Sequence, residues 1–281
     1  MPAVCVSSDL AEFAGTVLYA GRCHHRVHGR IEVLGYQNRA VNLADGPNSM
    51  VLHVPASGVT RGNFLSAGRD GRVLTRMLEA VRPVAAAAGG AAAMDWTGGE
   101  VEVFEHDIYT VVLASDPTRI PRALEEVPPH KRPRLRPELF EFYADVFPGH
   151  TIVLCCFDNA ELRQAKPLLL WYRPTDLDRL VLPALDSHTG DVPDLDAWVH
   201  PDHWLLFGTD EAGPDWGYPV DHGSTMRHEL REFLPDRVVG AEFSYGRVPN
   251  GDFALSRDDL LRGDLSKVER VRPVSSPGPA S

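Results

Sequence analysis

At 281 residues, the chain is long for one domain and short for two large ones. Its 43% hydrophobic and 24% charged residues are typical of a globular protein with a substantial core. The net charge of −11 argues against nucleic acid as the main partner, because affinity for DNA or RNA comes largely from cationic contacts to phosphate.

Cellular location is predicted from what the sequence lacks. The N-terminus does not resemble a signal peptide, and no apolar stretch reaches membrane-spanning length, so we expect no membrane partner. The four cysteines are Cys5, Cys23, Cys155 and Cys156. Four cysteines spread over 281 residues, two of them adjacent, do not form the disulfide framework of a secreted protein. These features predict a cytoplasmic protein, and the Ala/Gly/Arg/Asp/Pro-rich composition favours a bacterial source.

The first third of the chain predicts strands followed by one helix. Runs of branched and aromatic residues, separated by Gly, Asn, Asp and Pro, predict strands at 16–20, 31–36 and 50–54. Apolar residues at helical spacing behind Asp70 predict a helix over 70–82. The Ala/Gly-rich run that follows either extends this helix or forms a flexible connector.

The remaining chain alternates between strands and helices. Strands are predicted at 101–104 and 109–114, and two helices follow, one after Asp116 and one from Pro137. The apolar runs 151–157, 167–172 and 180–185 predict adjacent strands of a largely buried sheet, with 204–208 as a fourth. Further helices are predicted from Ser224 or Thr225 and over 257–268.

Together these elements predict an α+β fold with a mixed, mainly antiparallel sheet and flanking helices. Residues 1–269 are predicted to form a single compact domain, or two lobes that join near 84–99. Residues 270–281 are predicted to be a disordered tail, because no large apolar side chain follows Val274.

Histidines and aspartates gather just past the predicted strand at 179–185. Imidazole and carboxylate bind divalent metals or move protons near neutral pH. Successive side chains of an extended backbone point to opposite sides, so Asp186 and His188, two positions apart, lie on the same side. Together with His203 they form a candidate site for zinc or iron. The alternative is an acidic surface loop whose aspartates cap turns. The cluster comprises Asp186, His188, Asp191, Asp194, Asp196, His200, Asp202 and His203.

A second candidate is a thiol nucleophile at Cys156, at the end of a predicted strand. The histidine that such a nucleophile needs would be His188 or His203. Asp191 and His200 are further candidate catalytic residues. The alternative is that Cys156 packs as a small buried hydrophobe. No Gly-x-Ser-x-Gly, Gly-x-Gly-x-x-Gly or P-loop motif occurs, so no nucleotide cofactor is indicated.

Three functions remain open from the sequence. The first is a small cytoplasmic hydrolase that acts on a polar small molecule or peptide, with metal or His/Asp assistance at 186–203. The second is a hydrolase or transferase that uses Cys156 as its nucleophile. The third is a non-catalytic ligand-binding or protein-interaction protein.

Overall fold

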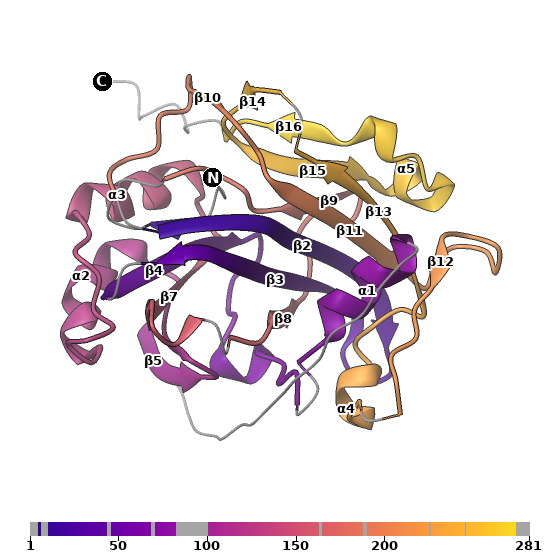
Figure 1. Cartoon of the computed structure of the whole chain (residues 1–281), viewed down its shortest axis with the longest axis horizontal. Helices are drawn as coiled ribbons and strands as arrows, with labels where there is room; N and C mark the ends of the chain where they lie inside the picture. Colours follow the sequence, from indigo (N-terminus) through magenta and orange to yellow (C-terminus); the bar gives the residue numbers. More distant parts are fainter. Residues whose placement is uncertain are drawn as a thin grey trace.

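A computed structural model describes most of the chain. The described residues are 5–6, 11–43, 46–68, 71–82, 101–162, 165–187, 190–224, 226–244 and 246–273. Within them the backbone forms four β-sheets and five short α-helices. Two of the sheets are large, and their long strands run through the middle of the molecule (Figure 1).

The larger sheet has six strands, and its neighbouring strands β2 and β3 are the longest among the described residues (Figure 1). Neighbouring strands pair antiparallel except β2 and β11, which run parallel. In spatial order the strands are β12 (Tyr218–Pro219), β13 (Arg237–Phe243), β11 (His203–Thr209), β2 (Ala11–His25), β3 (Gly29–Leu43) and β8 (Leu168–Tyr172).

The second large sheet has five antiparallel strands. They are β1 (Cys5–Val6), β4 (Pro47–Val54), β7 (Thr151–Asp158), β6 (Tyr109–Ala114) and β5 (Val101–His106). Two small antiparallel sheets complete the β-structure. One contains β16 (Glu269–Val271), β15 (Asp252–Ser256) and β9 (Arg179–Leu182), and the other contains β10 (Trp198–Val199) and β14 (Val248–Pro249).

The main core lies where the two large sheets and the three-stranded sheet face one another. Alternation along each strand decides which side chains enter it. Leu18 and Ala20 of β2 point into this core together with Met50 and Leu52 of β4, whereas Tyr19 points to the other face of its sheet. The three-stranded sheet contributes Leu180, Leu182, Phe253 and Leu255.

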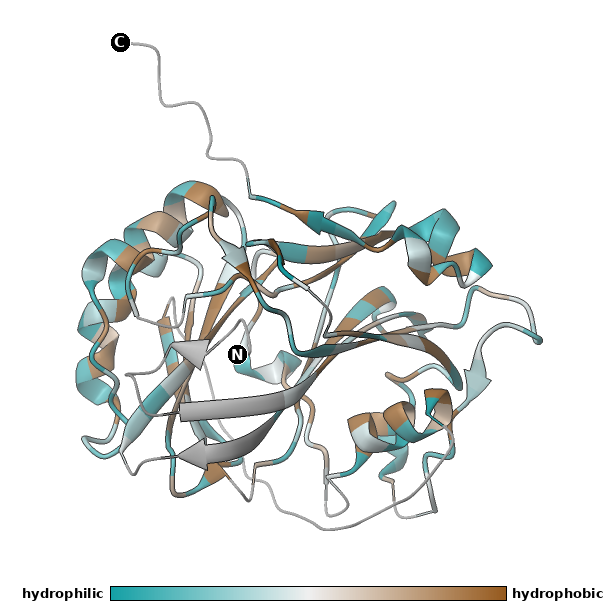
Figure 2. Ribbon diagram, turned by 45° about the horizontal axis from the view of Figure 1, so that its top comes forward, coloured by the Kyte–Doolittle hydropathy of each residue, from teal (hydrophilic) through white to brown (hydrophobic). Residues whose placement is uncertain are grey.

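Helices bury the outer face of each large sheet. Helices α2 (Ile120–Ala123) and α3 (Pro137–Val146) cover the five-stranded sheet. Helices α1 (Val73–Val81) and α4 (His228–Arg231) cover the six-stranded sheet. Helix α5 (Arg257–Arg262) follows β15, and short 3-10 turns are η1 (Arg61–Asn63), η2 (Pro117–Arg119), η3 (Leu124–Glu126) and η5 (Leu265–Lys267). Polar and apolar residues share each helix, as burial on one side requires (Figure 2).

The predicted fold class is confirmed, since the protein is α+β with mostly antiparallel sheets and flanking helices. The predicted grouping of three apolar strands is wrong. Strands β7, β8 and β9 lie in three different sheets. Strands β7 and β8 are buried on both faces, whereas in β9 only Leu180 and Leu182 are buried. An apolar run therefore indicates burial but does not identify the neighbouring strand.

Several helices and the C-terminus differ from the sequence prediction. Helix α4 spans only four residues, and the 257–268 helix is interrupted at Gly263, whose positive φ of 69° ends α5. Arg270 lies in β16, inside the segment that the sequence assigns to the tail, because Phe253 pairs with it. Asp70, the 84–99 connection and the tail from 274 onward lie outside the described residues.

Candidate functional site

Apart from His203, which begins β11, the predicted cluster lies on one long connection between β9 and β11. We call this connection, residues 183–202, the 183–202 segment. Among the described residues of this segment, the only regular structure is the two-residue strand β10. Connections longer than about 12–15 residues without their own secondary structure are uncommon in compact domains and are usually functional or disordered. In Figure 1, β10 lies with β14 at the upper edge of the molecule.

Asn250 fixes the backbone of this segment. The Asn250 side chain is buried; its Oδ1 accepts from the Asp186 N–H at 2.8 Å, and its Nδ2 donates to the carbonyls of Asp186 and Asp194, each at 3.0 Å. The Asn250 backbone N–H donates to the Ala197 carbonyl at 2.9 Å. One asparagine therefore holds the segment at three points, which excludes the disordered alternative for its described residues.

Further contacts fasten the segment along its length. Leu185 is buried against the apolar cluster beneath α3, and Leu195 packs against the same cluster. Asp191 pairs with Arg136 at the start of α3, with 2.9 Å between Oδ1 and Nε. Arg247 donates to the Trp198 carbonyl at 2.7 Å from Nη2, beside the pairing of β10 with β14.

Two large apolar side chains of the segment remain exposed to solvent. Val192 is 46% exposed and Trp198 is 54% exposed. Among the described residues, only three other large apolar side chains are comparably exposed, namely Val27, Leu177 and Tyr218. The segment therefore presents an indole on a backbone that the rest of the protein holds in place.

The predicted metal site is not formed by the described residues. Asp186 uses its backbone to bind Asn250, and His203 is fully buried in β11 beside Phe253. The His203 Nδ1 accepts from the Asp202 N–H at 3.1 Å, so this histidine supports the chain locally. His188 lies outside the described residues. No group of three His, Cys, Asp or Glu side chains in the described part of the chain is arranged to hold a metal ion.

The predicted catalytic residues are also dispersed. Asp191 is engaged with Arg136, and His200 lies on the surface. Cys156 is completely buried in β7 against the α3 side of its sheet, while Cys155 points into the main core. Burial, with the Glu105 carboxylate adding to it, raises the pKa of the Cys156 thiol to about 12. A nucleophilic cysteine requires the opposite shift, so the buried position of Cys156 favours the alternative that it packs as a small hydrophobe.

The structure reveals a buried polar cluster that sequence analysis missed, formed by His53, His150 and Asp252. His53 of β4 lies with Nε2 3.0 Å from Asp252 Oδ2, and its Nδ1 lies 3.2 Å from Nδ1 of His150. Phe147 stacks on the His53 ring at 3.7 Å between centroids. Asp252 Oδ1 accepts from the Ala184 N–H at 2.9 Å, so the cluster contacts the base of the 183–202 segment. A single histidine inside the apolar run of β4 was the one sequence signal for it.

Burial and the neighbouring groups together shift the pKa values of Asp252 and His150. Burial acts to raise the pKa of Asp252, but His53, the Ala184 N–H and Arg270 outweigh it and hold that pKa below its ordinary value. Burial and the neighbouring His53 lower the pKa of His150 to about 4, against a partial opposing effect of Asp252. Near neutral pH, Asp252 is therefore an anion and His150 is uncharged.

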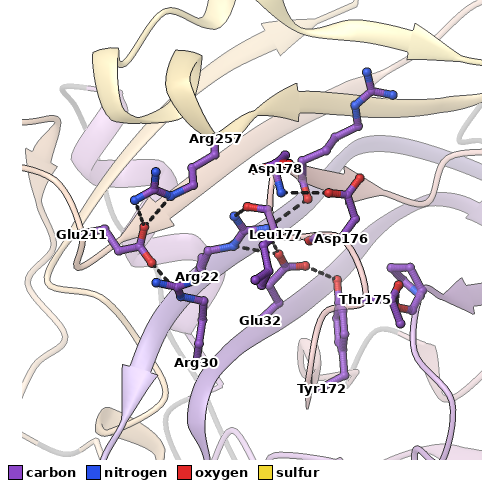
Figure 3. A network of polar contacts seen from close by, with 12 residues as sticks. Arg22, Arg30, Glu32, Tyr172, Thr175, Asp176, Leu177, Asp178, Glu211 and Arg257 are labelled. Carbon is purple, nitrogen blue, oxygen red and sulfur yellow. Dashed lines mark hydrogen bonds and ion pairs between the residues drawn. The ribbon is translucent and has the colours of Figure 1, made fainter.

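A second polar network frames the opposite part of the six-stranded sheet (Figure 3). Arg22 is fully buried and forms an ion pair with Glu32, which also accepts from the Tyr172 hydroxyl at 2.7 Å. The Arg22 guanidinium donates to the backbone carbonyls of Asp176, Leu177 and Arg179. Because all three side chains are closed to solvent, this network holds the turn before β9 and offers no reaction site.

Comparisons with known proteins add a distant structural likeness. No family model and no curated protein matches the chain. The crystal structure of baculovirus P35 is similar with a TM-score of 0.42 and 10% identity, over 92% of each chain. Two structures of a mutated baculovirus P35 after caspase cleavage are similar at 10% identity. One has a TM-score of 0.43 over 88% of this chain and 92% of that chain, and the other 0.39 over 70% and 67%.

These findings correct the expectation of a bacterial, metal-binding hydrolase. The described residues contain no metal-binding group, and Cys156 is sealed in the core. The similar structures are of a baculovirus protein and not of a bacterial one. A likeness of this size carries no statement about what the chain binds. No helix among the described residues is long and apolar enough to cross a membrane.

Proposed function

We propose that the protein is a non-catalytic protein-interaction protein that binds its partner through the 183–202 segment, with Trp198 as the anchor. The observation that carries this proposal is the 54% exposed indole on a fastened backbone. Tryptophan is among the side chains most enriched at energetic centres of protein interfaces, because it buries a large area with few rotatable bonds.

Rigidity of the segment supports a binding role. A loop that must be ordered on binding loses conformational entropy, and that loss weakens affinity. Here Asn250, Arg136 and the β10–β14 pairing have already ordered the backbone. A partner would therefore meet Trp198 on a backbone that is already ordered.

The surroundings of Trp198 indicate the chemistry of the partner. Asp194 and Asp196 lie exposed on the segment, and Arg247 lies exposed beside it, while Arg272 pairs with Asp196 at 3.0 Å. Charges of both signs therefore surround the indole. A partner with an apolar pocket and a rim of mixed charge complements this surface, as in typical protein interfaces.

Site-specific crosslinking tests the proposal. A photoreactive phenylalanine derivative placed at His200, which is exposed in the same segment and leaves Trp198 in place, is expected to crosslink one protein in a lysate of the source organism. Excess wild-type protein should compete for that crosslink, whereas excess Trp198→Ala protein should not. The matched control carries the same photoreactive residue at Tyr218, which is 55% exposed but lies outside the segment.

Two results would reject the proposal. One is the absence of any crosslink at position 200 that wild-type protein can displace. The other is equal crosslinking to the same protein from position 218, because the segment would then have no special role.

A further inference from the structure

We propose that Asn250–Gly251 is a deamidation site: the docked 183–202 segment suppresses the reaction, and the reaction, once it has occurred, releases the segment. The loss of partner binding that would follow rests on the proposed function, but the reaction and the release do not. The proposal follows from the chemistry of this dipeptide and from the contacts that its two residues make.

The dipeptide has the sequence that deamidates most readily. Asn250 is the only asparagine of the chain that glycine follows. Deamidation begins when the backbone nitrogen of the following residue attacks the asparagine Cγ, and glycine has no side chain to obstruct this approach. The new N–Cγ bond closes a succinimide ring, the Cγ–Nδ2 bond breaks, and Nδ2 leaves as ammonia with the proton that the Gly251 nitrogen gives up. Water then opens the ring and leaves aspartate or isoaspartate at position 250.

The structure requires both residues of this dipeptide. Asn250 is 2% exposed, and its Nδ2 donates to the carbonyls of Asp186 and Asp194, each at 3.0 Å. An ionised aspartate has no donor for these carbonyls. A Cβ atom at position 251 would collide with the carbonyl oxygen of Val271 in β16, so this position requires glycine. The chemically labile sequence is therefore a consequence of the way in which the segment is held.

The docked segment suppresses the reaction through the same contacts. For the attack, the Asn250 carboxamide has to turn toward the Gly251 nitrogen, and this turn breaks its hydrogen bonds to Asp186 and Asp194. The backbone is held as well, since the Asn250 N–H donates to the Ala197 carbonyl at 2.9 Å. The reaction therefore proceeds from molecules in which the segment has opened locally.

Either product removes the clamp. Aspartate at position 250 places a carboxylate where Nδ2 donated to the carbonyls of Asp186 and Asp194. Arg270, whose Nε donates to the Pro249 carbonyl, is a neighbouring cation, but a carboxylate paired with it still leaves both carbonyls without donors. Isoaspartate adds a carbon to the main chain between β14 and β15, each of which is paired with another strand. The segment therefore cannot dock again as before.

The rate of deamidation at position 250 tests the first half of the proposal. Purified protein is incubated near neutral pH, and the Asn, Asp and isoaspartate forms of the peptide that contains residue 250 are separated by chromatography and identified by mass spectrometry. The folded protein is expected to react at least about tenfold more slowly than the same protein in guanidinium chloride. Leu195→Ala, which loosens the segment, should accelerate the reaction of the folded protein about threefold or more.

Leu135→Ala is the matched control for this rate. Leu135 is also partly buried against the apolar cluster beneath α3, but it lies outside the segment. The rate of deamidation in this variant should stay within about twofold of the wild-type rate, because the segment remains docked.

Hydrogen exchange of the product tests the second half. The deamidated protein, separated by ion exchange on its additional negative charge, should exchange the Asp186 amide faster by on the order of tenfold, while the Leu206 amide of β11 stays protected. Asn250→Asp supplies the aspartate product without incubation. Its control is Asn48→Asp, which also places a carboxylate at a buried asparagine but leaves the segment and its exchange unchanged.

Three results would overturn the proposal. A lack of reaction at position 250 in the unfolded protein would remove the site, and equal rates in Leu195→Ala and Leu135→Ala would show that the segment does not suppress the reaction. Unchanged protection of Asp186 in the deamidated protein would exclude the release. Because these measurements involve no partner, they are independent of the crosslinking at position 200.

Discussion

Replacing Arg22 with Met should lower the free energy of unfolding by about 3–5 kcal/mol, the usual cost of breaking a buried ion pair. Arg22 and Glu32 are both closed to solvent, so the substitution leaves the Glu32 carboxylate without its counter-charge. It also removes the donor for three backbone carbonyls in the turn before β9. Urea denaturation followed by circular dichroism measures this loss.

Two further variants test whether the stability loss comes from leaving a buried charge unpaired. Arg30 is 45% exposed and pairs with Glu211 at 3.0 Å, so Arg30→Met should cost no more than about 1 kcal/mol. The double variant Arg22→Met with Glu32→Leu removes the unpaired carboxylate and should recover part of the lost stability. If Arg22→Met costs as little as Arg30→Met, the network does not hold the turn as described.

Removing the side chain of Asn250 should loosen the 183–202 segment. Asn250→Ala leaves the Asp186 N–H and the Asp186 and Asp194 carbonyls without their buried partner, and we expect a stability loss of about 2–3 kcal/mol. Protection of the Asp186 amide from hydrogen exchange should fall together with stability. Exchange measured by mass spectrometry over 184–202 checks this result.

Asn48→Ala is the matched control. Asn48 is also buried, but its amide donates to Asn159 at 2.9 Å and not to the 183–202 segment. Its substitution should destabilise the protein without selectively increasing exchange in the segment. Equal exchange profiles for the two variants would show that Asn250 is not the clamp.

The fold was largely predictable because periodicity reports burial. Most of the longer strands and helix α3 were found from their apolar residues, and Pro137 begins α3 as predicted. Sheet membership was not predictable, since β7, β8 and β9 share the same apolar character but pair with different strands. Short-range pattern contains no information about which distant strand supplies the hydrogen bonds.

The cluster that the sequence singles out overlaps the segment that we propose as the binding site, but the described residues do not form the predicted metal site. Asp, Pro and His are common both in metal sites and in turns, and only the structure shows that Asp202 accepts from the Gly15 N–H at 2.8 Å. Asn250 and the following glycine predict a turn, which conceals the role of the Asn250 side chain. His53 and Asp252 are 199 positions apart by residue number, so no local pattern could join them.

The affinity of the Trp198→Ala protein for the partner identified by crosslinking tests the central claim most directly. If the indole anchors the interface, its removal should weaken binding by about 30-fold or more, as expected for an energetic centre worth at least 2 kcal/mol. Tyr218→Ala, which removes an equally exposed aromatic ring outside the segment, should bind within about twofold of the wild type. Wild-type affinity in Trp198→Ala, measured by isothermal titration calorimetry with the fold intact, would contradict the claim.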